Sequence, residues 1–161
     1  MILSVLGQIL EVIGGILVFV GAIIVTSILI VRSLKASYKD VYKYQSKFDI
    51  ELRKMINLLS KVNGNGNGNG KLKDYQNEVI KELSHEEKKH LLLLIDEMYE
   101  GLDKLDDTNT YLVETFENLQ EERRIRDSKA IVFNHKILMF PFNIYAKILK
   151  MKKWDLFLHQ Q

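Results

Sequence analysis

The sequence predicts an all-α protein in which an N-terminal single-pass transmembrane helix continues into an antiparallel bundle of long helices. Three observations predict this architecture. Residues 1–31 carry one charged side chain, Glu11, although the whole chain has 23 basic and 21 acidic residues. Apolar residues after this segment recur at helical spacing. Pro141 is the one proline among 161 residues, so proline interrupts the predicted helices at a single point.

The predicted membrane segment runs from Val12 to Val31, a stretch of 20 residues without charge in which only Thr26 and Ser27 are polar. At 1.5 Å per residue, a helix of this length spans about 30 Å, the thickness of the hydrocarbon core of a bilayer. A cleaved signal peptide would need basic residues before a shorter apolar core, and no Lys or Arg precedes Glu11. We therefore predict a retained transmembrane helix.

Basic residues on one side of this helix predict its orientation. Five follow it within 16 residues: Arg32, Lys35, Lys39, Lys43 and Lys47. The positive-inside rule then places residues 32–161 in the cytoplasm as a helical bundle. Residues 1–31 form a short extracytoplasmic N-terminus and the transmembrane helix, in the cell membrane. Glu11 lies at or just inside the outer interface, either as an interfacial carboxylate or as a functional acid within the membrane.

Beyond the membrane, apolar side chains alternate at spacings of four and three residues over four heptads, with one interruption at Gln45. The central residues of this helix seam are Phe48, Leu52, Met55 and Leu59. Such a stripe belongs either to a helical bundle or to a two-stranded coiled coil. We favour the bundle because further helices follow in the same chain.

Residues 63–70 repeat Asn-Gly four times, and alternating glycines stop a helix. We expect a flexible loop there, at the end of the bundle farthest from the membrane. A second helical region is predicted over residues 72–105. Ser84, with Glu87 three residues later, has the sequence of a capping box and predicts that the helix restarts after a kink near Leu83.

Two more helices are predicted in the remainder of the chain. The third covers residues 110–139, with Asp107 or Thr108 as its N-cap. A helix break at residues 140–141 ends it, because proline disfavours helical geometry in the residue before it. A fourth, shorter helix is expected over residues 142–158.

The pattern of charged and histidine residues predicts neither catalysis nor a metal or cofactor site. His85 and His90 lie five residues apart, about 140° around a helix, whereas a metal-binding His-Glu-x-x-His pair needs a spacing of four. The chain has no cysteine, which removes thiolate ligands and nucleophiles. The pair Asp106-Asp107 fits a helix terminus better than a catalytic dyad. We expect a protein that is not an enzyme.

Charge is divided into three blocks along the cytoplasmic part. Residues 32–73 and 123–161 each have a net charge of +7, and residues 74–122 have −11. An acidic segment lying antiparallel between two basic ones pairs opposite signs and favours that topology. Because the basic segments are balanced in this way and tied to a membrane, we expect no nucleic-acid partner.

The C-terminal segment combines an apolar face with several lysines and Trp154. Basic amphipathic helices with Trp can lie on anionic membrane surfaces. The alternative is a fourth packing helix or a contact between copies of the chain. Counting helices away from and back toward the membrane puts Pro141 at the far end, so we favour packing.

Two segments resemble motifs of the LemA family of single-pass bacterial membrane proteins. The first is Phe48-Asp49-Ile50-Glu51-Leu52-Arg53-Lys54, and the second is Phe133-Asn134-x-x-Ile137-x-x-Phe140-Pro141-x-Asn143-Ile144-x-Ala146. The second segment crosses the predicted helix break. The order of parts, a short outer N-terminus, one membrane helix and then long helices, is also similar to the family's.

The second motif has a physical interpretation. Phe133, Ile137 and Phe140 are four and three residues apart, on one helix face, and are expected in the core. Asn134 and Asn143 flank the break, where amide side chains can satisfy backbone groups freed by the end of the helix. These residues, with Pro141, are predicted to set a bend and not to bind a ligand.

The resemblance implies a membrane-tethered helical scaffold or adaptor without known catalytic activity. It also suggests a membrane protease of the HtpX type as a partner. A rod with an apolar seam and separate charge blocks suits assembly into a homo-oligomer within the lipid bilayer. One alternative is a membrane-active protein, holin-like or membrane-remodelling, suggested by Glu11 in the apolar segment. Another is a signalling coiled coil through residues 48–62.

Overall fold

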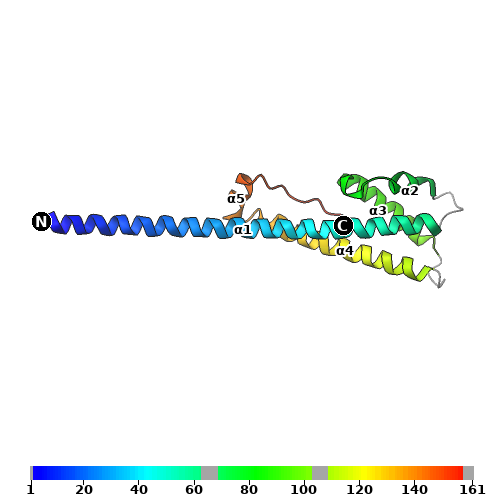
Figure 1. The fold of residues 1–161 in the computed structure, drawn as a ribbon, viewed down its shortest axis with the longest axis horizontal. Coiled ribbons are helices and arrows are strands. Elements are labelled where there is room, and N and C mark those ends of the chain that lie inside the picture. The colour runs from blue at the N-terminus through cyan, green and yellow to red at the C-terminus, as the bar shows by residue number, and fades with distance from the viewer. Residues whose placement is uncertain (1, 63–68, 103–108, 158–161) are drawn as a thin grey trace.

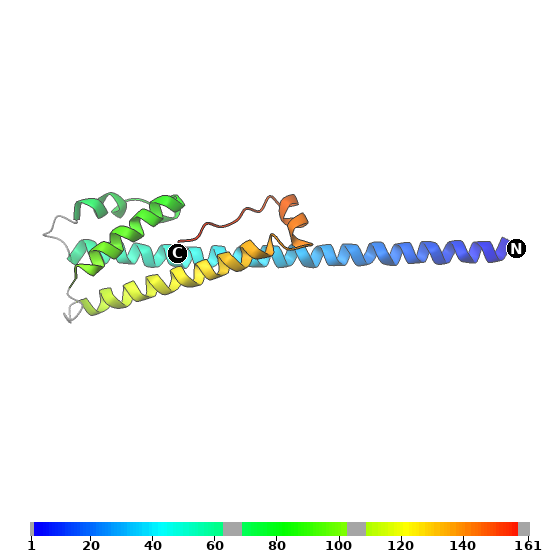
Figure 2. The ribbon, with the colours of Figure 1, turned by 180° about the vertical axis from the view of Figure 1, so that it is seen from behind.

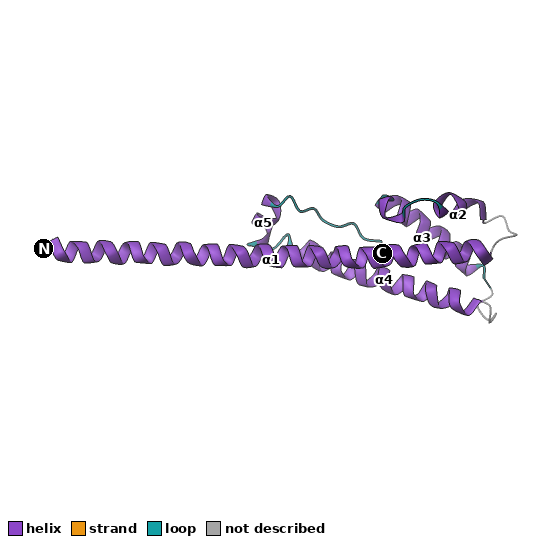
Figure 3. Cartoon of the chain, in the orientation of Figure 1, coloured by secondary structure: helices purple, strands orange, loops and turns teal. Residues whose placement is uncertain are grey.

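The computed structural model describes residues 2–62, 69–102 and 109–157, and these are helical apart from turns and one extended segment (Figure 3). The helices are α1 (Ile2–Val62), α2 (Asn69–Gln76), the 3₁₀ turn η1 (Ile80–Glu82), α3 (His85–Glu100), α4 (Thr110–Lys136) and α5 (Phe142–Ile148). Strands are absent from these described ranges, which confirms the predicted all-α class.

Helix α1 is a single unbroken helix of 61 residues, about 92 Å long at 1.5 Å per residue. Most of its N-terminal half stands clear of the other elements, and the bundle lies along its middle and C-terminal part (Figure 1). Residues 12–26 fall within the free part, with side chains such as Val18 (75 %) and Phe19 (68 %) exposed. The last turn of the apolar segment already contacts the bundle through Ser27 and Ile30. By length and composition, this helix is suited to crossing a membrane.

The other elements run back and forth beside α1 (Figures 1 and 2). We call the end of the bundle beside residues 12–31 the near end, and the end at Val62 the far end. Helix α2 runs from the far end toward the near end, and α3 runs toward the far end again. Helix α4 then packs along α1 as it runs to the near end. Helix α5 lies at the near end, and residues 149–157 turn outward once more.

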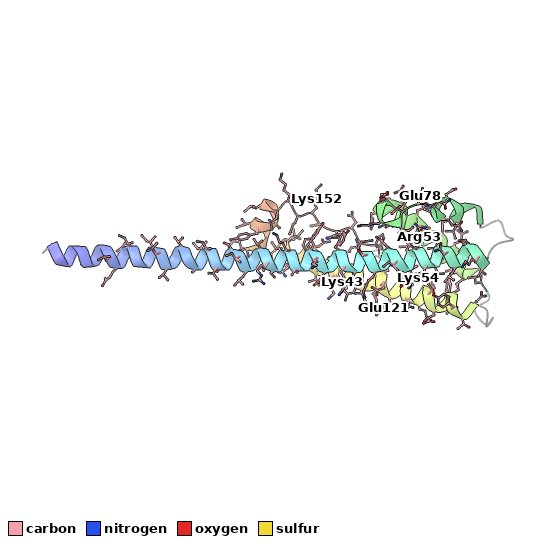
Figure 4. The ribbon with its side chains drawn as sticks, in the orientation of Figure 1. Lys43, Arg53, Lys54, Glu78, Glu121 and Lys152 are labelled. Carbon is pink, nitrogen blue, oxygen red and sulfur yellow. The ribbon has the colours of Figure 1, made fainter. Side chains whose placement is uncertain are left out.

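The predicted second helical region is therefore two helices joined by a reversal and not one helix with a kink. After α2, the chain passes through η1 and the extended residues Leu83 and Ser84 before α3 begins. Arg53 on α1 holds this connection by donating hydrogen bonds to the carbonyl oxygens of Tyr75, Gln76 and Glu78. Arg53 and Glu78 lie close together in Figure 4.

The reversal changes the direction of every later element, so the prediction that Pro141 lies far from the apolar segment is wrong. Pro141 sits at the near end. The hydroxyl of Tyr145 on α5 forms a hydrogen bond with the hydroxyl of Ser27. Ile137 and Ala146 pack in one cluster with Ile30 of α1. The prediction treated residues 72–105 as one helical region, whereas the chain forms two helices there, α2 and α3, that run in opposite directions.

Two clusters of buried residues fill the bundle. The far-end cluster joins α1, α2, α3 and α4: Phe48, Leu52, Met55, Ile56, Leu59, Leu72, Ile80, Leu91, Leu92, Ile95, Tyr99, Leu112, Leu119 and Phe157. The near-end cluster joins α1, α4 and α5: Ile30, Leu34, Val41, Ala130, Phe133, Ile137 and Ala146. The four central seam residues are fully buried in the far-end cluster.

Several predicted boundaries are confirmed and others move. The capping box is present, because the Ser84 side chain accepts from the backbone N–H of Glu87 and the Glu87 side chain accepts from that of Ser84. Helix α4 begins at Thr110 as expected but ends at Lys136, three residues early. Asn69 and Gly70 belong to α2 and not to the loop. The rest of the Asn-Gly repeat, the proposed N-caps Asp107 and Thr108, and the end of the predicted 72–105 region lie outside the described residues.

The fourth helix is shorter than predicted, because α5 ends at Ile148, residues 149–150 form a turn, and residues 151–157 are not helical. Lys150 adopts the left-handed conformation, with φ at 54°. The N–H groups of Lys150 and Met151 donate to the carbonyls of Lys147 and Ala146, the pair of bonds that defines a Schellman helix end. The reason the chain stays extended afterwards lies in side chains of α4.

Candidate functional site

One face of α4 presents a row of polar side chains to the extended C-terminal segment. We call Arg123, Arg126, Asp127 and Asn134 the clamp, and residues 154–157 the tail. Counted from Arg123, the other clamp residues follow after three, four and eleven positions, which are the spacings of one side of a helix. Their bonds go chiefly to the backbone of the tail.

Asn134 holds Trp154 at both of its backbone groups. The Asn134 Nδ2 donates to the Trp154 carbonyl and the Trp154 N–H donates to Asn134 Oδ1, each at 2.8 Å. A primary amide can satisfy a backbone N–H and C=O together because its donor and acceptor lie side by side. Asn134 was expected to satisfy freed groups at the helix break; it instead fixes the tail, 20 residues away.

The other clamp residues hold the rest of the tail. Asp127 Oδ2 accepts from the Phe157 N–H at 2.9 Å, and Arg123 donates to the Phe157 carbonyl at 3.0 Å. Arg126 donates to the carbonyl of Asp155. These bonds replace those that a helix would supply, so residues 154–157 remain extended.

Arg126 is the most enclosed cation of this site, at 2 % exposure. Its guanidinium donates to Asp127 Oδ1 at 2.7 Å and to Gln45 Oε1 of α1 at 2.8 Å. It also lies 5.5 Å from the ring of Trp154 and 4.7 Å from that of Phe157. Pairing with a fully buried carboxylate compensates its charge, and the aromatic faces add cation–π attraction.

Phe157 ties the tail to the helix seam. Its ring stacks on Phe48 at 4.8 Å between centroids and on His85, the first residue of α3, at 4.4 Å. The tail thereby touches α1, α3 and α4 at once. His85 is partly buried against Phe157.

A buried ion pair lies beside this aromatic stack. Lys88 Nζ on α3 is 2.8 Å from Asp49 Oδ1 on α1, and the two side chains are 7 % and 10 % exposed. Gln45 Nε2 donates to the same Asp49 oxygen at 2.9 Å. Gln45 therefore links this pair to Arg126, and one polar network runs from α3 through α1 to α4.

A cleft of about 320 Å³ opens over the network. Its walls carry four basic side chains and two acidic ones, so opposite charges are mixed across it with an excess of bases: Lys81, Lys88, Arg126, Lys153, Asp49 and Asp155. In the part of the chain that the structure describes, His, Asp and Glu side chains do not gather in a set of three that could hold a metal ion. The arrangement is suited to holding an extended backbone.

The structure separates the residues of the C-terminal motif. Phe133 and Ile137 are buried, as expected, but Phe140 is 80 % exposed and does not belong to the core. The helical spacing that put Phe140 on their face does not apply, because α4 ends at Lys136. Pro141 follows a cis peptide bond and is partly buried, while Asn143 Oδ1 is buried without a hydrogen-bond partner among the described residues.

Sequence reasoning missed Arg126 and Asp127 as buried residues. The signal was their position: Leu119, Ala130 and Phe133, all buried, lie on the same face of α4, three to eight residues away. Two adjacent opposite charges on a core face indicate a paired polar contact. The remaining predicted site residue, Glu11, is exposed on the free part of α1.

The chain matches no protein-family model, no curated protein and no solved structure.

Proposed function

We propose that the protein is a non-enzymatic scaffold or adaptor of the LemA type, anchored in the cell membrane by residues 12–31. What supports the anchor is the continuity of α1, which joins the free apolar segment to the bundle without a break. The exposed apolar side chains of that segment are those that lipid would cover. The bases that follow residue 31 orient the bundle, residues 32–161, toward the cytoplasm.

The polar residues of the clamp support a binding role over a catalytic one. Asp127 and Asn134 are engaged by the tail backbone, and Arg126 is engaged by Asp127, Gln45 and the tail. Side chains bonded in this way are fixed in position, and they hold the C-terminal segment against α4. In this proposal the protein acts by holding the bundle at the membrane, where other proteins can bind it.

We further propose that the anchored chain assembles into a homo-oligomer. The test is the mass and shape of the full chain in lipid nanodiscs, by light scattering and electron microscopy, with empty discs as the control. We expect a closed particle whose protein mass is a multiple of the 18.8 kDa chain. A particle with one chain per disc would contradict self-assembly and leave an adaptor.

The partner suggested by the LemA resemblance is a membrane protease of the HtpX type. Crosslinking in membranes followed by capture of the tagged chain tests this partner. We expect the protease among the captured proteins, and a tagged anchor lacking the bundle provides the control. Equal recovery with the control would contradict a specific partnership through residues 32–161.

A further inference from the structure

A cluster of exposed apolar side chains lies where α4 turns into α5. We call it the elbow patch: Leu138, Met139, Phe140, Ile144 and Ile148. Phe140 is 80 % and Ile148 is 70 % exposed, although the residues on the opposite side of α5 are packed in the near-end cluster. Five large apolar side chains left exposed within eleven consecutive residues indicate a contact site.

The patch lies at the depth of the last turn of the apolar segment. Tyr145 of α5 reaches Ser27 of α1, and Ile137 and Ala146 pack with Ile30. Ser27 is about 6 Å along the helix from Val31, the last residue of the segment. If residues 12–31 cross the bilayer, as proposed above, α5 lies at the boundary between hydrocarbon and headgroups.

The charges around the patch are basic. No acidic residue occurs between Asp127 and Asp155. Lys147, Lys150 and Lys152 are exposed, and Lys152 points away from the bundle in Figure 4. This surface complements anionic lipid headgroups, which attract lysines close to the membrane.

A second cleft lies just beyond the elbow. It has a volume of about 440 Å³ and lies between Tyr38 of α1 and residues 149–154. Three of its lining residues are Lys150, Lys152 and Lys153. Tyr38 is about 10 Å along α1 from Val31, so long lysine side chains here lie within reach of the headgroup layer.

We propose that the elbow is a second membrane contact, in which Phe140, Ile144 and Ile148 enter the cytoplasmic leaflet and the neighbouring lysines bind anionic headgroups. This inference rests on the proposed membrane anchor. The bundle is then held at two points, α1 and the elbow, which fixes how it leans and turns relative to the bilayer. Interfacial binding of this kind combines apolar burial with attraction to anionic lipid.

The experiment measures the depth of single nitroxide labels in the full chain. The natural chain has no cysteine, so one introduced cysteine takes the label. The variants are Phe140→Cys and Ile148→Cys in the elbow, Val18→Cys in the anchor and Tyr111→Cys as the matched control. Tyr111 is an exposed aromatic residue at the far end of α4, the helix that leads to the elbow.

The chain is placed in vesicles of phosphatidylglycerol and phosphatidylethanolamine, and collisions of each label with oxygen are compared with those with a water-soluble nickel complex. We expect severalfold more collisions with oxygen at the elbow and anchor labels, and the reverse at Tyr111→Cys. An immersed anchor label with aqueous elbow labels overturns the elbow contact alone. Aqueous labels at both places overturn the anchor as well.

Two further outcomes decide what covers the patch. Spin–spin broadening between Phe140→Cys labels, without preference for oxygen, would identify a second copy of the chain as the occupant and overturn the lipid contact.

Replacing Lys147, Lys150 and Lys152 together by Gln should move the Phe140→Cys label toward water in vesicles with phosphatidylglycerol. The shift should vanish in phosphatidylcholine vesicles, and an equal shift in both lipids would overturn the headgroup contact.

Discussion

Lys88 and Asp49 form a pair whose energetics depend on both partners. Removing two charges from water costs several kcal/mol per ion, and the attraction between them repays this only while both are present. Lys88 belongs to α3 and Asp49 to α1, so the pair also fixes the register of these two helices. Gln45 occupies the same Asp49 oxygen and limits its movement.

Asp49→Ala should therefore destabilise the bundle by about 3–5 kcal/mol, because it leaves the Lys88 ammonium buried and unpaired. The double variant Asp49→Leu/Lys88→Met removes both charges and should be close to the natural chain in stability. Thermal unfolding followed by circular dichroism measures both. A cost below about 1 kcal/mol for Asp49→Ala would show that the pair behaves as an exposed one.

Lys150 adopts a backbone conformation that is strained for a residue with a Cβ atom and is not strained for glycine. Its φ of 54° lies in the left-handed region, and it occupies the position after the α5 C-cap where glycine is usual. Lys150→Gly should stabilise the chain by about 1 kcal/mol, whereas Lys150→Val should destabilise it, because a β-branched residue resists this conformation. Comparing the melting temperatures of the two variants with that of the natural chain tests whether residue 150 adopts the left-handed conformation. A lower melting temperature for Lys150→Gly than for the natural chain would refute it.

At the scale of elements, the sequence was informative where structure is local. The capping box at Ser84 lies within four residues and was predicted correctly. The fourth helix was predicted correctly from residue 142 to 148 but wrongly from 149 to 158. The apolar spacing there is helical, but Asn134, Arg126 and Asp127 of α4 bind the backbone of residues 154–157. Contacts of this kind join residues 20 or more positions apart and leave no periodic signal in either segment.

The α3 cap has a pH dependence that can be measured. Hydrogen bonds from the Ser84 side chain and backbone N–H hold the pKa of Glu87 below its ordinary value of 4.5. The stabilisation is therefore complete above pH 4.5 and is lost as the pH falls through the lowered pKa. Glu87→Gln keeps an acceptor for the Ser84 N–H and does not titrate. The natural chain should lose stability relative to Glu87→Gln as the pH falls below 4.5; a constant difference in unfolding free energy would contradict this.

The clamp predicts what releases the tail. Asn134→Ala leaves the N–H and C=O of Trp154 without partners, at a cost of about 1–3 kcal/mol. Because Trp154 is the one tryptophan in the chain, its emission reports the tail directly and should shift to longer wavelength. Asn143→Ala is the matched control, since Asn143 Oδ1 has no partner within the described residues. Identical spectra for the two variants would exclude Asn134 as the residue that holds the tail.

At the scale of the whole molecule, one unrecognised reversal inverted the predicted direction of everything after it. Periodicity identified helical segments, and the buried seam residues Phe48 and Leu52 lie where helix packing needs them. Periodicity does not tell a bend from a turn back, because both look like a short interruption between apolar stripes. At the reversal, Arg53 binds three carbonyls at and just after the end of α2, a contact across more than 20 residues.

The unbroken α1 has a mechanical consequence. From Arg32 to Val62 it extends about 45 Å beyond the apolar segment, so tilting that segment moves the opposite tip as a lever arm does. Transmembrane helices tilt by about 20° on average and tilt further when the bilayer is thin. A tilt of that size displaces the tip sideways by about 15 Å. With residues 12–31 spanning the bilayer, as proposed above, a change in bilayer thickness would be amplified into a sideways displacement of the bundle tip by about 15 Å.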